Sequence, residues 1–341
     1  MVETMSRWAI DALGGASLRL MEAIVPEPRP GEILAKVSAV SLNYRDKLMI
    51  ETGMGVPLAF PFTPASDMAG TVAALGTGVD RFKVGDRVIS TFMPGWIDGQ
   101  GAGNARAPSY RTLGGELPGV LAEYVAFPQD WFSRAPESLD DGEASTLPVA
   151  GLTAWFALVE RGGLRAGQTV VVQGTGGVAL FGLQIAKLHG AEVIVTSGSE
   201  EKLARAKTAG ATHGVNRHNG SWVEEVYRLT NDRGADHILE IVGGANLGAS
   251  IQAVAVHGRI SMIGLLEGLE ISGPAVPLLL KFPTIQGIAV GHRRALEDLC
   301  RAVDLSGLKP VIHRRYSFAD VPAALTDLDR GPFGKIVIEL G

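Results

Sequence analysis

Residues 169–179 read Thr-Val-Val-Val-Gln-Gly-Thr-Gly-Gly-Val-Ala, an apolar β-branched run that leads into a glycine-rich turn and then into a helical pattern. The turn fits the spacing G-x-G-x-x-G/A, with Ala179 at its last small position. The first glycine permits a tight turn, the second lets the backbone approach a pyrophosphate, and Ala179 allows close helix–strand packing. The amides of the first helical turn face the anion. The stretch predicts a dinucleotide site formed by Gly174, Thr175, Gly176, Gly177 and Val178.

Strand and helix patterns alternate around this turn. We expect strands at 169–173, 191–197, 212–216, 237–242 and 259–263, and helices at 178–188, 200–208, 221–230 and 246–254. A strand at 284–290 and a helix at 294–305 follow. Such alternation predicts an α/β fold with a parallel, doubly wound sheet covered by helices on both faces.

The chain ends have a different character. Short β-rich runs at 32–40, 68–74 and 87–90 are separated by Gly and Pro turns, and β character returns at 335–340. These runs predict a barrel-like or irregular β domain that the tail rejoins. Two segments, 94–119 and 265–283, fit neither pattern, and loops of this length are uncommon unless they bind something or cover a site.

Composition excludes several classes of protein. With 46% hydrophobic and 20% charged residues, the 341-residue chain is typical of a globular protein of two domains. A net charge of −5 without a Lys/Arg block argues against a nucleic-acid partner. The sequence has no signal peptide and no apolar run of membrane-spanning length, so we expect a cytoplasmic protein without a membrane partner. Its single cysteine, Cys300, excludes an internal disulfide and a multi-cysteine zinc site.

The end of the second strand of the α/β repeat predicts which dinucleotide binds. No carboxylate stands at its tip, where one would hold the adenosine ribose of NAD. The hydroxyls of Ser197 and Ser199 and the cations of Lys202 and Arg217 suit a 2′-phosphate instead, so we expect NADPH. Each cation, taken alone, is equally consistent with a solvated surface charge. The acidic pair at 200–201 opposes this prediction, although acidic residues in a first helical turn also interact favourably with the helix dipole.

Several further stretches carry a family resemblance. The chain resembles the medium-chain dehydrogenase/reductase superfamily, and within it the zinc-free branch of quinone oxidoreductase-like proteins and zinc-independent alcohol dehydrogenases, on residues 41–46, 62–70, 84–88, 151–155 and 334–337. The resemblance implies a GroES-like catalytic domain of residues 1–126 and 306–341, a Rossmann domain of residues 127–305, and a substrate cleft in the seam. It also implies a homodimer formed through the Rossmann domains. The apolar run 276–280 is compatible with that dimer or with a core.

The resemblance also bears on zinc. In zinc-containing relatives the catalytic ligands are a Cys before the first-domain helix, a His in a Gly-His-Glu segment, and a Cys near the domain crossing. The matching places here hold Asn43, Ser66 and residues 149–150, none of them a competent zinc set. The four-cysteine structural lobe is missing as well. We therefore expect chemistry without a metal.

Without a metal to polarise a carbonyl, activated acceptors suit hydride transfer best. A quinone or enone reductase is therefore the leading hypothesis. Similar proteins place the segment after residue 42 in the cleft, so we expect Asn43 and Tyr44 beside the nicotinamide ribose and substrate, with Asp46 orienting the local network or anchoring Arg45. The alternatives are a packed aromatic for Tyr44 and a structural ion pair for Asp46.

The remaining site residues come from the same resemblance. Thr153 begins a helix beneath the nicotinamide, caps that helix, or does both. Phe62 and Trp96 line the substrate pocket, although Trp96 is as well suited to pinning its own loop. Further cofactor contacts are expected from Val242, Gly243, Ile263, Gly264, Leu265, Gly287, Ile288 and Ala289, and from Lys335 near the pyrophosphate.

Two other functions fit the sequence. One is a zinc-independent alcohol dehydrogenase that acts on a simple alcohol, aldehyde or ketone, with Tyr44 as the acid. The other is a non-catalytic NADPH-binding sensor, because a fold alone does not establish catalysis.

Overall fold

The structure is a computed structural model that describes residues 3–341. The chain forms two compact units. The barrel unit runs to Leu152 and resumes at Gly291, and the Rossmann unit comprises Thr153–Val290. The contacts thus place residues 127–152 and the whole expected 294–305 helix with the barrel, because strand and helix packing ties both segments to it. The family-based domain boundaries at 126/127 and 305/306 stay a prediction.

The Rossmann unit contains the expected parallel sheet. Its six strands lie in the order β10-β9-β8-β11-β12-β13. They are β8 (Thr169–Gln173), β9 (Glu192–Ser197), β10 (His213–Asn216), β11 (Ala235–Glu240), β12 (Val254–Met262) and β13 (Thr284–Gly287). The order reverses between β8 and β11, the switch point at which open α/β sheets bind ligands. The predicted fold class is confirmed.

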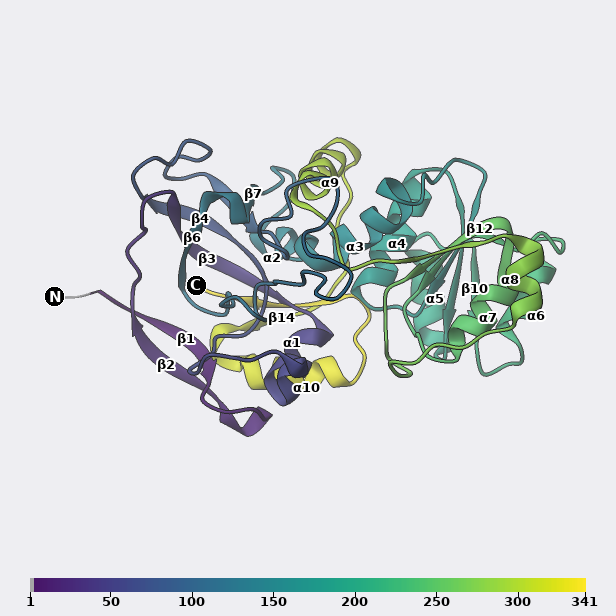
Figure 1. Ribbon diagram of the computed structural model, residues 1–341, viewed down its shortest axis with the longest axis horizontal. Helices are drawn as coiled ribbons and strands as arrows, with labels where there is room; N and C mark the ends of the chain where they lie inside the picture. Colours follow the sequence, from purple (N-terminus) through teal and green to yellow (C-terminus); the bar gives the residue numbers. More distant parts are fainter. Residues whose placement is uncertain (1–2) are drawn as a thin grey trace. The chain divides into compact units, whose positions relative to one another are not determined.

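Helices cover both faces of this sheet. The helices are α3 (Leu152–Trp155), α4 (Gly177–Leu188), α5 (Glu200–Thr208), α6 (Trp222–Leu229), α7 (Asn246–Ala253) and α8 (Ala275–Lys281), with the π-helical turn η5 (Phe156–Glu160) after α3. The π-helical turn η4 (Leu147–Gly151) precedes α3 and belongs to the barrel unit. Figure 1 shows α4 and α5 on one face and α6, α7 and α8 on the other. The buried core includes Val171, Ile194 and Ile238 from three neighbouring strands. Helix α8 lies inside the expected loop 265–283, where one short apolar run gave no helical period.

The barrel unit is built on a seven-stranded mixed sheet. Its main path is β14-β15-β3-β4-β5-β7, with β6 paired to β3, and β1 and β2 form a separate hairpin. The strands are β1 (Thr4–Ile10), β2 (Leu18–Ile24), β3 (Glu32–Leu42), β4 (Asp67–Leu75), β5 (Arg87–Ser90), β6 (Tyr124–Pro128), β7 (Phe132–Arg134), β14 (Ile312–Ser317) and β15 (Lys335–Glu339). Its core is an apolar cluster that includes Val40, Met68, Phe132 and Ile336.

The tail completes this sheet, as the sequence predicted. Strand β15 pairs antiparallel with β3, and Ile336 lies opposite Leu42. This register brings the start of β15 to the end of β3, where α1 begins. The helices of the unit are α1 (Tyr44–Thr52), α2 (Asp141–Ala144), α9 (Arg293–Ser306) and α10 (Val321–Asp329), with 3-10 turns η1 (Gly15–Ser17), η2 (Gly53–Gly55), η3 (Gln129–Trp131) and η6 (Phe318–Asp320). Among residues 3–341, no helix has the length and apolar character that crossing a membrane requires.

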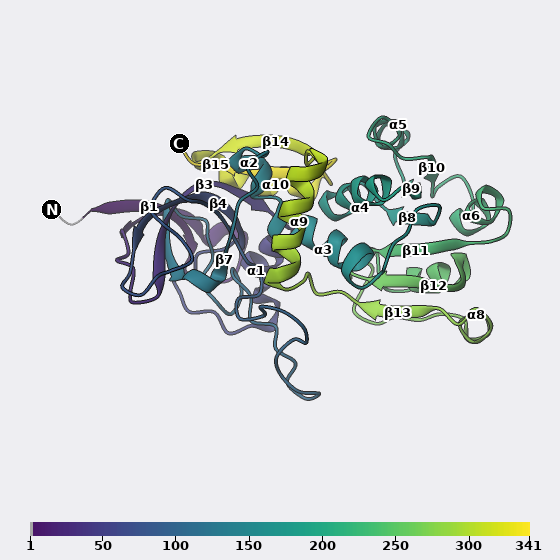
Figure 2. The same ribbon diagram turned by 90° about the horizontal axis from the view of Figure 1, so that it is seen from above.

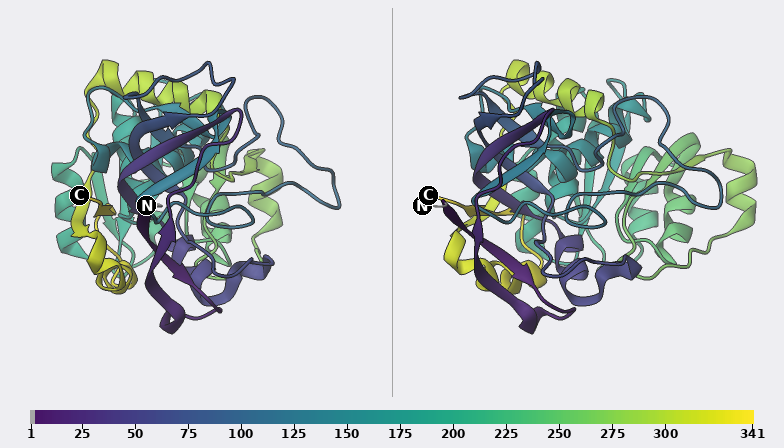
Figure 3. Two further views of the ribbon diagram at one scale, coloured as in Figure 1. Left: turned by 90° about the vertical axis from the view of Figure 1, so that its left-hand side faces the viewer. Right: turned by 60° about the vertical axis from the view of Figure 1, so that its left-hand side comes forward.

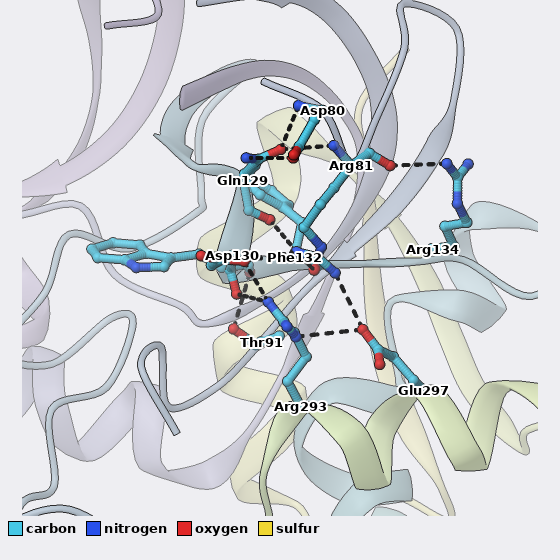
Figure 4. Close-up of polar contacts among 10 residues, drawn as sticks. Asp80, Arg81, Thr91, Gln129, Asp130, Phe132, Arg134, Arg293 and Glu297 are labelled. Atoms are coloured by element: carbon cyan, nitrogen blue, oxygen red, sulfur yellow. Dashed lines mark hydrogen bonds and ion pairs between the residues drawn. The ribbon is translucent and has the colours of Figure 1, made fainter. Parts of the chain in front are cut away.

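The irregular segment 94–119 forms a long loop of the barrel unit (Figures 2 and 3). It is fixed to the start of α9, since Arg293 and Arg294 donate backbone hydrogen bonds to Trp96 and Ile97. Beside it lies an ionic network in which Arg81 and Arg293 share Asp130 and Glu297 (Figure 4). These contacts give the loop and α9 a structural role at this edge of the barrel.

Candidate functional site

The glycine-rich turn joins β8 to α4 in the Rossmann unit. Gly174 adopts φ +81°, a conformation that favours glycine, and its amide donates to Thr196 O at 2.8 Å. A Cβ on Gly174 or Gly176 would meet no heavy atom within 4 Å, so the space above both residues is open. Gly176 is the N-cap of the twelve-residue α4 and has no side chain to occupy the first amides. The turn thus fits a pyrophosphate.

A later glycine, which the sequence motif does not include, lets α4 pack on the sheet. A Cβ on Gly182 would lie 2.4 Å from Leu239 Cδ1 on β11. Ala179, which was expected to provide this close approach, is also buried. The motif ends one helical turn too early to identify Gly182. The sequence feature that could have indicated this packing role is the position of Gly182 inside an otherwise apolar helix.

The tip of β9 carries the hydroxyls and cations expected around a 2′-phosphate. Ser199 caps α5 by accepting from Lys202 N at 3.3 Å, and Ser197 Oγ accepts from Ser199 N. A Cβ on Gly198 would lie 3.3 Å from Arg217 Nε and 2.5 Å from His218 Nε2. The loop after β10 therefore brings its two basic side chains against this tip. His218 was not singled out by the sequence.

Glu200 and Glu201, whose negative charges oppose a 2′-phosphate at the tip of β9, interact with other side chains of the Rossmann unit. Glu200 accepts hydrogen bonds from Asn216 Nδ2 at 2.5 Å and from Asn219 Nδ2 at 3.4 Å. Glu201 is exposed and lies 4.0 Å from Arg205 on the same helix. Both carboxylates thus have partners within the unit.

A buried carboxylate, Glu240, lies at the switch point, and the sequence analysis missed it. Its two oxygens accept from two backbone amides and three side chains: Val242 N, Gly243 N, Asn246 Nδ2, Gln173 Nε2 and Ser250 Oγ. The residue is fully enclosed. An acidic residue at the end of an apolar strand was the available signal, because such a group must be partnered.

This network changes how two predicted cofactor residues can act. The amides of Val242 and Gly243 both point to Glu240, at 3.0 and 2.9 Å. Their carbonyls accept from Glu267 and Asn246. The backbone polar groups of both residues are therefore engaged inside the unit, and any cofactor contact would use their nonpolar atoms.

The other predicted cofactor residues of this unit lie at the ends of β12 and β13. Ile263 N and Gly264 N both donate to Glu240 O, and a Cβ on Gly264 would lie 1.7 Å from Ile241 O, so only glycine fits. Leu265 is exposed, whereas Ile288 is buried and donates to Met262 O. Gly287 ends β13 and Ala289 follows two residues later. Their predicted contacts with a cofactor stay predictions.

Thr153 does not begin a helix, which corrects one expectation. The helical segment is already formed at Leu147, and Thr153 is the second residue of α3. An N-cap has non-helical backbone and precedes the first turn, so this buried threonine cannot serve as one. Its predicted contact with the nicotinamide stays a prediction.

A buried charged cluster lies at the head of α1 in the barrel unit. Lys335, the first residue of β15, is only 4% exposed. Its Nζ donates to Asn43 Oδ1 and to Leu42 O, each at 2.6 Å. Burial lowers the pKa of Lys335, while the charges of Asp67 and Asp46 act in the opposite direction. The sequence had assigned Asn43 and Lys335 to different functions, and the structure joins them.

Asp67 supplies negative charge to the same cluster. Ser66 Oγ donates to Asp67 Oδ1 at 2.6 Å, and Val149 N donates to Asp67 Oδ2 at 3.1 Å. Burial raises the pKa of Asp67, against the opposing charge of Lys335 and the Asn43 side chain. Asp67 was not predicted as a site residue.

Asp46 closes the first turn of α1. Its Oδ2 accepts from Asn43 N at 2.7 Å, while Oδ1 has no hydrogen-bond partner among the described residues and lies 4.0 Å from Arg45 Nη1. Burial raises the pKa of Asp46 to about 6. Arg45 is held chiefly elsewhere, by Leu113 O, Gly114 O and Thr112 Oγ1. Asp46 therefore orients Asn43 more directly than it anchors Arg45.

The remaining predicted residues of this unit are Tyr44, which follows Asn43, and the aromatic residues Phe62 and Trp96. Tyr44 is 45% exposed at the first position of α1, so it is not the packed aromatic of the alternative reading. Phe62 is 5% exposed and packs with Ile10 and Ile50, which is a core position. Trp96 donates to Gly99 O and stacks edge-on against His292, contacts that pin its own loop. Substrate contact by Phe62 and Trp96 stays a prediction.

The places that match zinc ligands do not fit the metal. Asn43 offers an amide oxygen that a lysine ammonium already contacts, Ser66 offers a hydroxyl that donates to Asp67, and Val149 offers a backbone amide. Zinc prefers thiolate, imidazole and carboxylate ligands in tetrahedral sets. Within residues 3–341, no three His, Cys, Asp or Glu side chains are grouped as a metal site requires.

A doubly wound sheet with a turn that suits a pyrophosphate, joined in one chain to a barrel unit, is the architecture that nucleotide-dependent oxidoreductases share. Two family models match the chain: the alcohol dehydrogenase GroES-like domain over residues 29–137 and the zinc-binding dehydrogenase over residues 177–305. The chain belongs to the medium-chain dehydrogenase/reductase family, as the resemblance predicted.

Its relatives carry two kinds of name. A zinc-type alcohol dehydrogenase-like protein of Schizosaccharomyces pombe is 34% identical over 336 residues, 96% of either chain. The quinone oxidoreductase of Rattus norvegicus is 27% identical, covering 94% of this chain and 92% of its own. A crystal structure from Sinorhizobium meliloti 1021, provisionally named an alcohol dehydrogenase, is 66% identical with a TM-score of 0.97 and covers 99% of both chains. An NAD-dependent alcohol dehydrogenase is 33% identical with a TM-score of 0.88, covering 99% of this chain and all of its own.

Proposed function

We propose that this protein is a zinc-independent, NADPH-dependent reductase that transfers hydride to a quinone or an α,β-unsaturated carbonyl compound. The observation that carries the proposal is the Lys335–Asn43 hydrogen bond, because a lysine ammonium contacts the side-chain oxygen of a residue at a place that matches a zinc ligand. Activated acceptors delocalise the incoming electron pair onto oxygen and need less electrophilic help than an isolated ketone.

The cofactor part of the proposal rests on the Rossmann unit. The turn at Gly174 and Gly176 would hold the pyrophosphate, and Ser197, Ser199, Lys202 and Arg217 would surround the 2′-phosphate. When bound, NADPH supplies a hydride from C4 of its nicotinamide. One structural relative is named as NAD-dependent, so the test compares NADPH with NADH.

The chemical part rests on α1 of the barrel unit. Tyr44 is an exposed residue, and its hydroxyl can donate a hydrogen bond or a proton to the acceptor oxygen. Asn43 and Asp46 hold the first turn of α1 from the buried side. The acceptor gains the hydride at carbon and a proton at oxygen or at the α-carbon, and the nicotinamide is oxidised.

An alcohol dehydrogenase acting on a simple alcohol, aldehyde or ketone is the second candidate. The names of the Schizosaccharomyces pombe relative and of both structural relatives favour it. In that reaction Tyr44 would act as the proton donor without help from a metal, which is a larger demand on one phenol.

The test follows absorbance at 340 nm while chelator-treated protein meets NADPH or NADH with a panel of quinones, enones, aldehydes and ketones. Turnover of quinones or enones with NADPH supports the proposal. Turnover of simple aldehydes or ketones only favours the alcohol dehydrogenase. Cofactor binding without any turnover favours a non-catalytic NADPH sensor. Stoichiometric zinc whose removal abolishes activity contradicts the metal-free chemistry.

We also propose a cytoplasmic homodimer formed through the Rossmann units. Strand β13 is the edge of its sheet, and the adjacent α8 exposes Val276, Leu279 and Leu280. Apolar side chains beside an unpaired strand edge are suited to contact with a second copy of this chain. Light scattering of the wild type and of Leu279→Glu tests the dimer, and fractionation of cells tests the location.

A further inference from the structure

We infer that Lys335 is an internal cation of the barrel unit that positions Asn43. In relatives that contain zinc, the residue that matches Asn43 is held by the metal instead. This inference rests on the proposed function for its catalytic consequence only. It assigns Lys335 to the barrel in place of the pyrophosphate contact that the family resemblance implied.

The position of Lys335 follows from the sheet register. Ile336 pairs with Leu42, so the preceding lysine lies at the end of β3 beside Asn43. Its ammonium reaches Leu42 O and Asn43 Oδ1 at 2.6 Å each. A buried ammonium is tolerated only where acceptors and an opposite charge compensate for lost hydration. Both kinds of partner are present here.

Asp67 is the main opposite charge. The charge of Asp67, more than that of Asp46, opposes the lowering of the pKa of Lys335 by burial, and the charge of Lys335 in turn opposes the raising of the pKa of Asp67 by burial. Ser66 and Val149 each donate one hydrogen bond to Asp67. All three places that match zinc ligands are therefore tied to this lysine and aspartate: Asn43 to Lys335, and Ser66 and Val149 to Asp67.

The geometry also defines how Lys335 acts. Two of its three N–H groups are directed to Leu42 and Asn43, and the residue is almost fully enclosed. Asn43 is the N-cap of α1, and its own amide donates to Asp46. Lys335 is thus a positioning residue that fixes the head of α1, and with it the exposed Tyr44.

The first experiment is a double-mutant cycle on thermal stability at pH 8, with Lys335→Met, Asp67→Asn and the double variant. Each single variant should lose on the order of 10 °C in Tm, because it leaves one buried charge without its partner. The double variant should lose less than the two single losses added together. Additive losses would overturn the internal charge pair. The result does not depend on any enzymatic activity.

The second experiment measures NADPH affinity by cofactor fluorescence, with Lys36→Met as a control. Lys36 is an exposed lysine of β3 in the same sheet. Lys335→Met, and the charge-neutral double variant if the single one is unstable, should bind NADPH within twofold of the wild type. A tenfold or larger loss would assign Lys335 to the pyrophosphate and contradict the inference.

The third experiment measures steady-state kinetics with an acceptor from the panel. Lys335→Met and Asn43→Leu should each lower kcat about tenfold with little change in the acceptor KM, and the double variant should be no worse than either single one. Multiplicative losses would show that the two residues act independently. If the wild type turns over no acceptor, the proposed function fails, whereas the stability cycle and the binding measurement still decide the role of Lys335.

Discussion

Both units of this protein bury carboxylates, but they satisfy them differently. Glu240 in the Rossmann unit accepts hydrogen bonds from two backbone amides and three side chains. Asp46 in the barrel unit accepts one backbone amide and leaves one oxygen without a hydrogen bond among the described residues. A fully satisfied network fixes a backbone, whereas an under-satisfied one retains a tunable charge. The difference teaches that the carboxylate at the switch point is held by a complete set of donors, whereas the head of α1 contains a carboxylate whose protonation responds to pH.

The largest expected effect tests the satisfied side of this comparison. Glu240→Ala would leave several buried donors without an acceptor and should cost on the order of 4 kcal/mol in the free energy of unfolding. Urea denaturation measures the loss. Glu192→Ala, an exposed glutamate at the start of β9, is the matched control and should change stability little. Equal small effects would show that the network contributes nothing.

The next prediction concerns Asp46 and the change of the free energy of unfolding with pH. Burial raises the pKa of Asp46 to about 6, so the folded protein keeps a proton between about pH 4 and 6 that the unfolded chain has released. Stability should therefore fall as the pH rises through this window, by on the order of 3 kcal/mol. Asp46→Asn should lack this part of the pH dependence.

The measurement is the free energy of unfolding of wild type and Asp46→Asn at pH 4 and pH 7. Glu27→Gln, at an exposed glutamate of the same unit, serves as the control and should follow the wild type. Parallel pH profiles for all three proteins would mean that Asp46 titrates as an ordinary surface carboxylate.

A smaller effect concerns the tip of β9, where the sequence predicts that polar groups of the Rossmann unit recognise a 2′-phosphate. Lys202→Ala should weaken NADPH binding about tenfold and NADH binding much less, because only NADPH carries the 2′-phosphate. Fluorescence titration with both cofactors measures the ratio. Lys207→Ala, later in the same helix, is the control. Equal losses for the two cofactors would show that Lys202 does not recognise the phosphate.

The smallest effect concerns a buried group of the barrel unit away from the cluster. Burial raises the pKa of the Cys300 thiol, which lies on the covered side of α9. The native protein should therefore react with a thiol reagent far more slowly than the unfolded protein. Rapid native reaction would indicate that α9 opens readily and that the responsive part of the unit extends beyond the head of α1.

Local patterns predicted the fold well. The apolar run before the glycine turn is β8 with the bounds expected, and α5 also begins and ends where its pattern indicated. The pattern failed at α8, because six apolar residues that include a proline, followed by Lys281, show no helical period. It failed at Thr153 as well, since a π-helical turn that starts at Leu147 has no distinctive sequence.

The sequence by itself determined the doubly wound sheet, the phosphate-binding turn and the family, because these depend on residues close together in the chain. Only the tertiary structure decided that Lys335 meets Asn43, 292 residues away, and that Glu240 meets Gln173, Asn246 and Ser250. Partners of buried charges are chosen by sheet register and strand order. Those long-range pairings leave no periodic pattern in the sequence. The charged residues could therefore be identified from the sequence, but their partners could not.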